Sequence, residues 1–223
     1  MEKLTSSLKN MLLSLALISI VVAGLLAFVY GLTKEPIEQA AKQKQENAIR
    51  EVTPDFNNNP VEEQFEVEIS NGDKLVVFPA KQDGKLIGIA VETNTQKGFS
   101  GEIKIMAGFD MNGIVKNYSV LKHAETPGLG SKMQEWFKPQ GKREKSLIEK
   151  IFGFEVKEEK RNSSVIGRDI SKNKLMVTKD GGDIDAITAA TVSSRAFMDA
   201  LNRAYEAYLK VKENDSQTQE STE

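Results

Sequence analysis

The segment FEVEISNGDKLVVFPAKQDGKLIGIAV, residues 65–91, carries the signals of successive β-hairpins. It begins with apolar residues that alternate with acids, which is the period-two pattern of a half-buried strand. The turn residues SNGD at 70–73 precede an apolar run at 75–78, and Asp83-Gly84 separates that run from another at 86–91. Because Asp-Gly between apolar runs favours a tight turn, the segment predicts antiparallel strands.

Another hairpin and a terminal helix are predicted further along the chain. The turn Asn112-Gly113 lies between apolar residues at 103–105 and 114–120. The last element is a helix from Val192, because apolar or small residues recur on one of its faces: Ala196, Phe197, Ala200, Leu201, Ala204, Tyr205 and Tyr208. Weaker patterns predict a helix and a short strand between these elements, at 146–152 and 174–177.

Strands grouped before a terminal helix predict an α+β fold, with the folded domain at residues 64–212. The sequence after it, ENDSQTQESTE at 213–223, is polar throughout, and we expect a disordered tail. A polar helix and a linker are predicted before the domain, at residues 34–63. Pro36 suits the first turn of that stalk helix, and the proline- and asparagine-rich segment 53–63 ends it.

An uncharged run precedes the stalk. Residues 11–33, MLLSLALISIVVAGLLAFVYGLT, exceed the roughly 20 apolar residues that cross a bilayer core. A cleaved secretory signal is the alternative, but its apolar part would span only about 7–15 residues, so we expect a retained transmembrane helix. Two lysines lie within residues 1–10, whereas Lys34 is followed at once by Glu35. This charge bias places residues 1–10 in the cytoplasm and the folded domain outside.

Composition limits the chemistry of this chain. It has no cysteine, which excludes disulfides, iron–sulfur clusters, thiolate metal sites and cysteine nucleophiles. The single histidine, His123, excludes a multi-histidine metal site, and we expect no bound metal. The net charge of −2 without blocks of like charge argues against nucleic-acid binding. Redox chemistry would therefore need an organic cofactor, and we identify no catalytic side chain.

The segment DAITAAT at 185–191 leads directly into the terminal helix. A helix N-terminus presents unpaired N–H groups and a partial positive charge, which favour a phosphate group. The hydroxyl of Thr191 could carry such a phosphate as an ester, and the small residues Ala189 and Ala190 leave room for it. Taken alone, Thr191 and Ser193 are both ordinary candidates for the helix N-cap.

This segment resembles the flavinylation motif of FMN-binding domains, Asp-x-x-Ser/Thr-Gly-Ala-Thr. In that family a flavin transferase, drawing on FAD, esterifies the last threonine with the phosphate of FMN. The resemblance implies that Thr191 carries covalent FMN and that Thr188 supports the phosphate. It assigns three further residues to the cofactor site: Asp185, Ala189 and Ala190. The family usually has glycine where this chain has Ala189, and glycine serves either a special backbone angle or a close approach.

A second segment, HAETPGLG at 123–130, is by composition alone a surface turn. It resembles a signature of one branch of the family, the G subunit of the Rnf (Rsx) ion-translocating electron-transport complex. The glycine-rich turn at 98–101 belongs to the same resemblance. It implies that the HAETPGLG loop lies against the isoalloxazine ring, with Glu125 and Thr126 as polar contacts and the backbone of Leu129-Gly130 beside the flavin.

The resemblance implies a membrane-anchored electron carrier, with a single span in the bacterial cytoplasmic membrane and an extracytoplasmic domain. Its partners would be the other membrane subunits of an Rnf-type complex, which couples electron transfer between ferredoxin and NAD to ion translocation, and a flavin transferase. Two alternatives remain: a cofactor-free membrane-anchored sensor or adaptor, and a stand-alone flavin reductase. Against the reductase, no glycine fingerprint for a nicotinamide cofactor follows a predicted strand.

Overall fold

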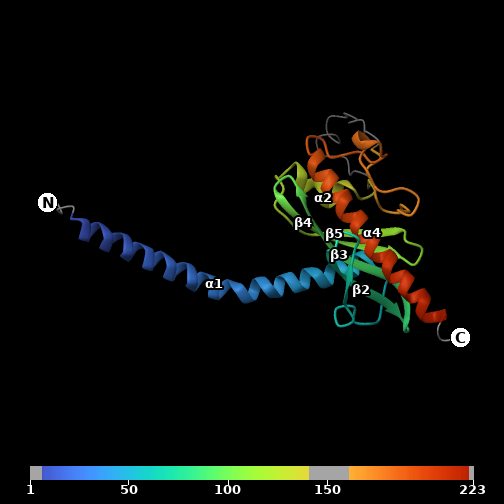
Figure 1. The fold of residues 1–223 in the computed structure, drawn as a ribbon, viewed down its shortest axis with the longest axis horizontal. Coiled ribbons are helices and arrows are strands. Elements are labelled where there is room, and N and C mark those ends of the chain that lie inside the picture. Colours follow the sequence, from blue (N-terminus) through green and yellow to red (C-terminus); the bar gives the residue numbers. More distant parts are fainter. Residues whose placement is uncertain (1–6, 141–160, 221–223) are drawn as a thin grey trace, which may run out of the picture. The chain divides into compact units, whose positions relative to one another are not determined.

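The computed structural model describes residues 7–140 and 161–220, and the helix predicted at 146–152 lies outside this range. The chain divides between Lys44 and Gln45 into two compact units. The first contains most of helix α1 (Leu8–Val52). The second contains the end of α1, a five-stranded sheet and the C-terminal helix (Figure 1).

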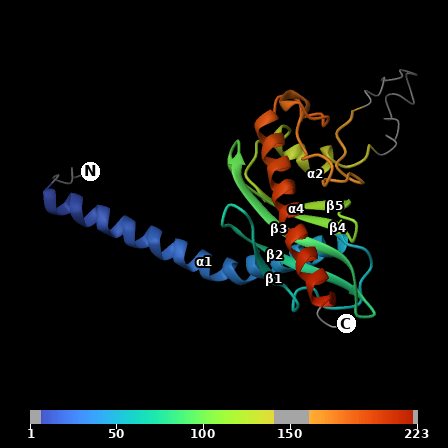
Figure 2. The same cartoon turned by 45° about the vertical axis from the view of Figure 1, so that its right-hand side comes forward.

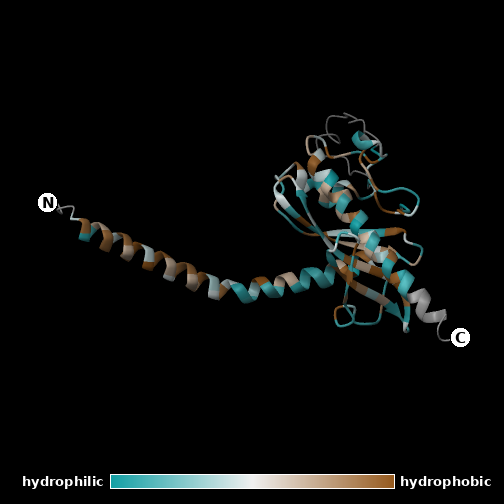
Figure 3. Cartoon of the chain, viewed as in Figure 1, coloured by the Kyte–Doolittle hydropathy of each residue, from teal (hydrophilic) through white to brown (hydrophobic). Residues whose placement is uncertain are grey.

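Helix α1 runs without interruption from Leu8 to Val52, so the predicted span and the predicted stalk form one helix. Pro36 therefore lies inside a helix and not in the first turn of a separate one. Proline has no backbone N–H group, so the helix lacks one hydrogen bond at Pro36. The flanking residues are mostly good helix formers and continue the helix on both sides. An 18-residue window of α1 has a mean hydropathy of 2.8 and is 0% buried, so α1 is long and apolar enough to cross a membrane (Figure 3).

The sheet is antiparallel, and its strands lie in sequence order: β1 (Phe65–Glu68), β2 (Lys74–Gln82), β3 (Lys85–Gly98), β4 (Gly101–Asp110) and β5 (Val115–His123). The predicted turns are confirmed, with Asp83-Gly84 between β2 and β3 and Asn112-Gly113 between β4 and β5. Asp83 and Gly84 have φ angles of 50° and 77°, the left-handed values that a tight hairpin turn requires. The sheet and its helices confirm the α+β class.

Two helices cover opposite faces of this sheet. Helix α4 (Thr191–Glu220) packs on one face, which Figure 2 shows from a second direction, and the last turns of α1 pack on the other. On β2, Val77 belongs to the α4 core and Phe78 to the α1 core, and on β3 the same holds for Val91 and Ala90. This division follows from the alternation of side chains along a strand. The compact unit thus begins within α1, earlier than the predicted domain start at residue 64.

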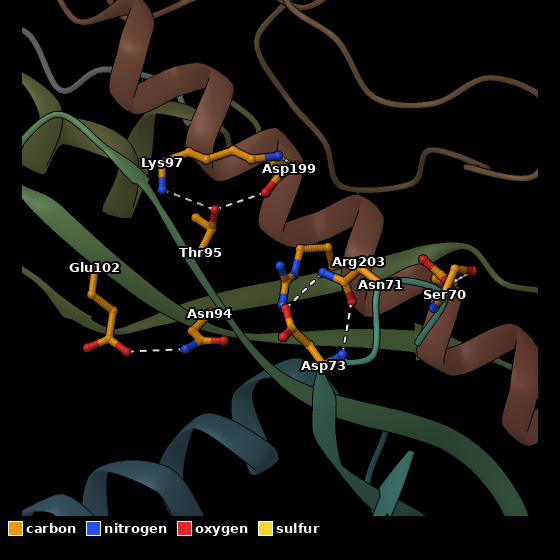
Figure 4. A network of polar contacts seen from close by, with 10 residues as sticks. Ser70, Asn71, Asp73, Asn94, Thr95, Lys97, Glu102, Asp199 and Arg203 are labelled. Atoms are coloured by element: carbon orange, nitrogen blue, oxygen red, sulfur yellow. Dashed lines mark hydrogen bonds and ion pairs between the residues drawn. The ribbon is translucent and has the colours of Figure 1, made fainter. Parts of the chain in front are cut away.

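Helix α4 confirms the predicted terminal helix and continues to Glu220, past the position at which we expected the polar tail to begin. Polar contacts fasten this helix to the sheet (Figure 4). Asp199 accepts hydrogen bonds from Lys97 Nζ at 2.7 Å and from Thr95 Oγ1 at 2.9 Å. Arg203 donates to Asp73 Oδ2 at 2.6 Å. Because Thr95 and Lys97 lie near the end of β3, the two contacts of Asp199 hold the first half of α4 beside the β3–β4 turn, while Arg203 joins the helix to the β1–β2 turn.

The short strand predicted at 174–177 is wrong. Val177 makes a single isolated bridge with Ile184, and a 3₁₀ helix, η2 (Thr178–Asp180), follows at once. The backbone N–H and carbonyl of Leu175 bond instead to the side-chain amide of Asn202 on α4, at 3.0 and 2.9 Å. A side chain from α4 therefore satisfies the groups that a neighbouring strand would otherwise pair.

Candidate cofactor site

A cavity of about 320 Å³ lies at the N-terminus of α4. Its walls come from three segments that are distant in sequence: the β3–β4 turn, the loop after β5 and the start of α4. The lining residues are Phe99, Glu125, Thr126, Leu129, Gly130, Ala189, Ala190, Thr191, Val192 and Ser193. The fold thus brings the HAETPGLG loop and the DAITAAT segment to one cavity.

Two of the residues that the sequence assigned to the cofactor site do not line this cavity. Thr188 is exposed to solvent. The carboxylate of Asp185 accepts a hydrogen bond from the N–H of Asn162 at 2.7 Å, and the backbone carbonyl of Asp185 accepts one from Trp136 Nε1 at 2.9 Å. Asp185 therefore anchors the segment that leads to the cavity, while the other predicted residues form the wall.

The start of α4 is set by contacts between Ser194 and the residues just before the helix. Neither of the predicted N-caps, Thr191 and Ser193, is the capping residue. The N–H of Ser194 donates to the carbonyl of Ala190 at 3.0 Å, which makes Ala190 the capping residue and Thr191 the first residue of the helix. Ser194 Oγ also accepts the N–H of Ile187 at 2.9 Å. The N–H groups of residues 191–193 precede the first helical hydrogen bond and have no acceptor within the helix. Residues 191–193 line the cavity, so their N–H groups could bind an anion there.

Ala189 has a φ of 60°, one of two positive values for non-glycine residues in the described chain. This left-handed turn lets the N–H of Ala190 bond to the carbonyl of Ile187 at 2.9 Å, just before the helix begins. Such an angle costs an L-residue roughly 1–2 kcal/mol, whereas glycine adopts it freely. The sequence analysis gave two reasons for glycine at this position, a special backbone angle or a close approach. The structure supports the backbone angle.

We expect Ala189→Gly to stabilise the protein by about 0.5–1 kcal/mol. The free energy gained by removing the left-handed strain exceeds the free energy by which the greater freedom of glycine stabilises the unfolded chain. Thermal unfolding of the detergent-solubilised chain measures this change. Ala190→Gly is the matched control, because Ala190 is buried and that change should be destabilising. A lower melting temperature for Ala189→Gly than for the unaltered chain would contradict the strain argument.

Glu125 is only 4% exposed and connects all three walls of the cavity. Its Oε1 accepts the N–H of Ser100 in the β3–β4 turn at 3.2 Å, and its Oε2 accepts the hydroxyl of Ser193 on α4 at 2.5 Å. Glycine is required on both sides of this carboxylate. A Cβ on Gly98 would lie 2.6 Å from Oε1, and one on Gly130 would lie 2.5 Å from Oε2. Glu125 also lines the cavity, so its predicted contact with the flavin stays a prediction, and the structure adds that its carboxylate holds the three walls together.

His123, which received no role from the sequence, shapes the loop. Its Nδ1 accepts the N–H of Glu125 at 3.2 Å. Further along the loop, the carbonyl of Thr126 accepts the N–H of Leu129 at 3.2 Å, and Gly128 turns with a φ of 75°. These contacts direct Glu125 inward and leave Thr126 and Leu129 exposed at the cavity.

Besides Ser193, which the sequence analysis considered only as a helix N-cap, sequence reasoning missed three contributors to the site. Phe99 lines the cavity although it is 70% exposed, and Val192 is a second exposed apolar residue there. An aromatic residue inside a glycine-rich turn was the available signal for Phe99. The third contributor, Lys179, places its Nζ 3.3 Å from Thr191 Oγ1. It lies in η2, which only the tertiary structure brings to the start of α4.

Comparison with known protein families matches two segments of the chain. Residues 98–206 match the FMN-binding domain, and residues 1–52 match the RnfG N-terminal region. The chain is 33% identical to the G subunit of the ion-translocating oxidoreductase complex of Vibrio cholerae serotype O1, over 91% of this chain and 90% of that protein. The corresponding G subunits of Salmonella typhimurium and Haemophilus influenzae are 33% and 32% identical, covering 86% and 91% of this chain and 86% and 89% of theirs.

Proposed function

Because the chain belongs to the family of G subunits of ion-translocating oxidoreductase complexes, we propose that it is a membrane-anchored electron carrier with FMN esterified to Thr191. One observation carries this proposal: two distant motifs line a single cavity at the start of a helix. The chain has an FMN-binding domain and a helix that is long and apolar enough to cross a membrane. The proposal adds the covalent bond between FMN and Thr191.

The start of α4 fits the phosphate of FMN. Thr191 supplies the hydroxyl, and the N–H groups of residues 191–193 supply donors and the positive end of the helix dipole. In the proposed maturation, Thr191 Oγ1 bonds to the flavin-side phosphorus of FAD, the pyrophosphate bond breaks and AMP leaves. The hydroxyl proton passes to a base of the flavin transferase. The resulting phosphodiester keeps one negative charge for the N–H groups to bind.

The mouth of the cavity fits an aromatic ring system. Phe99, Leu129 and Val192 present exposed apolar side chains there, which a planar cofactor would cover. When bound, FMN supplies the redox chemistry. The side chains of this protein orient the ring and exclude water from one side of it. A cofactor-free adaptor would leave the exposed apolar rim and the unpaired N–H groups without a purpose.

The proposed partners are the other membrane subunits of an Rnf-type complex, which would couple electron transfer between ferredoxin and NAD to ion translocation. This chain would not move the ion itself, because residues 11–33 carry no ionisable group other than Tyr30 to line a path. The domain would lie on the extracytoplasmic side, with residues 1–10 in the cytoplasm.

We expect affinity purification of the chain in mild detergent to recover several polytopic subunits. A chain without residues 1–33 is the matched control and should lose them, because the membrane helix would be the main contact. Recovery of the full chain only as a free monomer across gentle conditions would contradict a role in a complex.

A separate experiment on spheroplasts tests the orientation in the membrane. Protease added to spheroplasts should digest the folded domain, which the charge bias around α1 places outside. Complete protection of the domain in spheroplasts, with digestion after lysis, would contradict the proposed topology.

A further inference from the structure

Lys179 lies beside the threonine that we propose to be modified. Its Nζ is 3.3 Å from Thr191 Oγ1, and both side chains are accessible to solvent. Within residues 7–140 and 161–220, Lys179 forms no salt bridge. Its charge is therefore available to a ligand on Thr191.

The turn that carries Lys179 is fastened to α4 by the next residue. Asp180 accepts hydrogen bonds from Arg195 Nε at 2.7 Å and Nη2 at 2.6 Å, and Arg195 lies one helical turn after Thr191. Hydrogen bonding from Arg195 holds the pKa of Asp180 below its usual value, so the pair stays ionised at neutral pH. Lys179 is thus attached through Asp180 to the helix that bears Thr191.

Glycine and backbone contacts fix the other end of this turn. Gly181 ends η2 with a φ of 86°, and a Cβ on Gly182 would lie 2.1 Å from the carbonyl oxygen of Met176. The N–H of Thr178 donates to the carbonyl of Ile184 at 2.9 Å. The packed turn therefore fixes the backbone of Lys179, and its long side chain reaches Thr191 from there.

The charges around the cavity call for a cation at this position. The buried carboxylate of Glu125 already lies in the cavity wall, and a phosphodiester on Thr191 would add a second negative charge. The helix N-terminus offers only a partial positive charge, about +0.5. Arg195 is compensated by Asp180, which leaves Lys179 as the full charge beside Thr191 Oγ1.

We propose that Lys179 binds the phosphate of the flavin attached to Thr191. This assignment rests on the proposed covalent FMN and deepens it. Lys179 is a binding residue for the phosphoryl group, both while the ester forms and in the finished protein. Its ammonium group pairs with a non-bridging phosphate oxygen, and its role is electrostatic.

The first test measures the initial rate of covalent flavin incorporation, with limiting flavin transferase and FAD, by fluorescence after denaturing electrophoresis. We expect Lys179→Gln to lower the rate about fivefold and Lys179→Glu to lower it more, as befits an exposed charge pair at a helix N-terminus. Lys179→Arg should restore most of the rate. The matched control is Lys172→Gln, because Lys172 is exposed, pairs with Asp169 and lies outside this cavity.

The second test measures the protein after loading, once the transferase has been removed. Each variant is loaded to completion, and its melting temperature is compared with that of the same variant before loading. We expect the increase on loading to be smaller for Lys179→Gln than for Lys172→Gln. The difference between these variants should shrink at high salt, because salt screens the pairing of Lys179 with the phosphate.

The outcomes separate this assignment from the proposed function. If the unaltered chain acquires no covalent flavin with a competent transferase, the proposed function and this assignment both fail. If it is loaded and Lys179→Gln matches Lys172→Gln in both tests, only the assignment of Lys179 is overturned. A slower rate with an unchanged increase in melting temperature also overturns it, because Lys179 would then contact the transferase and not the phosphate.

Discussion

Thr191→Ala is expected to abolish covalent flavin attachment completely while leaving the fold intact. The hydroxyl is the only group at the first position of α4 that could form the phosphoester. The helix keeps its start because the carbonyl of Ala190 and the side chain of Ser194 provide the capping contacts. Loss of the Thr191 side chain should therefore cost less than the roughly 1 kcal/mol of a lost N-cap.

The measurement is the fluorescence of the chain after denaturing electrophoresis, with mass spectrometry of the peptide that contains residue 191. The unaltered peptide should carry FMN minus water. Thr188→Ala is the matched control, because Thr188 is exposed, lies in the same segment and does not line the cavity. It should weaken the fluorescent band at most. A covalent flavin that persists in Thr191→Ala would show that the ester forms elsewhere.

Gly130→Ala is expected to disrupt the cavity. A Cβ at this position would lie 2.5 Å from both Glu125 Oε2 and Ser193 Oγ, which are hydrogen-bonded to each other. The methyl group must separate the two, and the buried carboxylate would lose a donor. We expect a loss of about 2–4 kcal/mol in the free energy of unfolding, from overpacking and from an unsatisfied buried group.

The melting temperature of the detergent-solubilised chain and the yield of covalent flavin both report this change. Gly128→Ala is the matched control in the same loop. Its φ of 75° makes it strained, but a Cβ there meets nothing within 4 Å, so its cost should be only about 1 kcal/mol. If Gly130→Ala retains the stability and flavin yield of Gly128→Ala, Glu125 does not hold the walls together as the geometry indicates.

Those parts of the fold that depend on residues close in sequence were predictable. Asp83-Gly84 and Asn112-Gly113 determine their hairpins because the turn geometry is a property of the dipeptide. The apolar face of α4 and the uncharged run at 11–33 are likewise periodic or continuous patterns within one segment. Where a pattern was short, as at 174–177, the side chain of Asn202 from a distant helix decided the outcome instead.

Local patterns in the sequence were sufficient for the membrane helix, the hairpins, the terminal helix and the two motifs of the candidate site. The folded structure was needed to show that these motifs share a cavity, that Glu125 joins its three walls, and that Lys179 lies beside Thr191. The difference arises from separation along the chain. Each of these contacts joins segments whose proximity depends on how α4 packs across the sheet, and no local pattern encodes that packing.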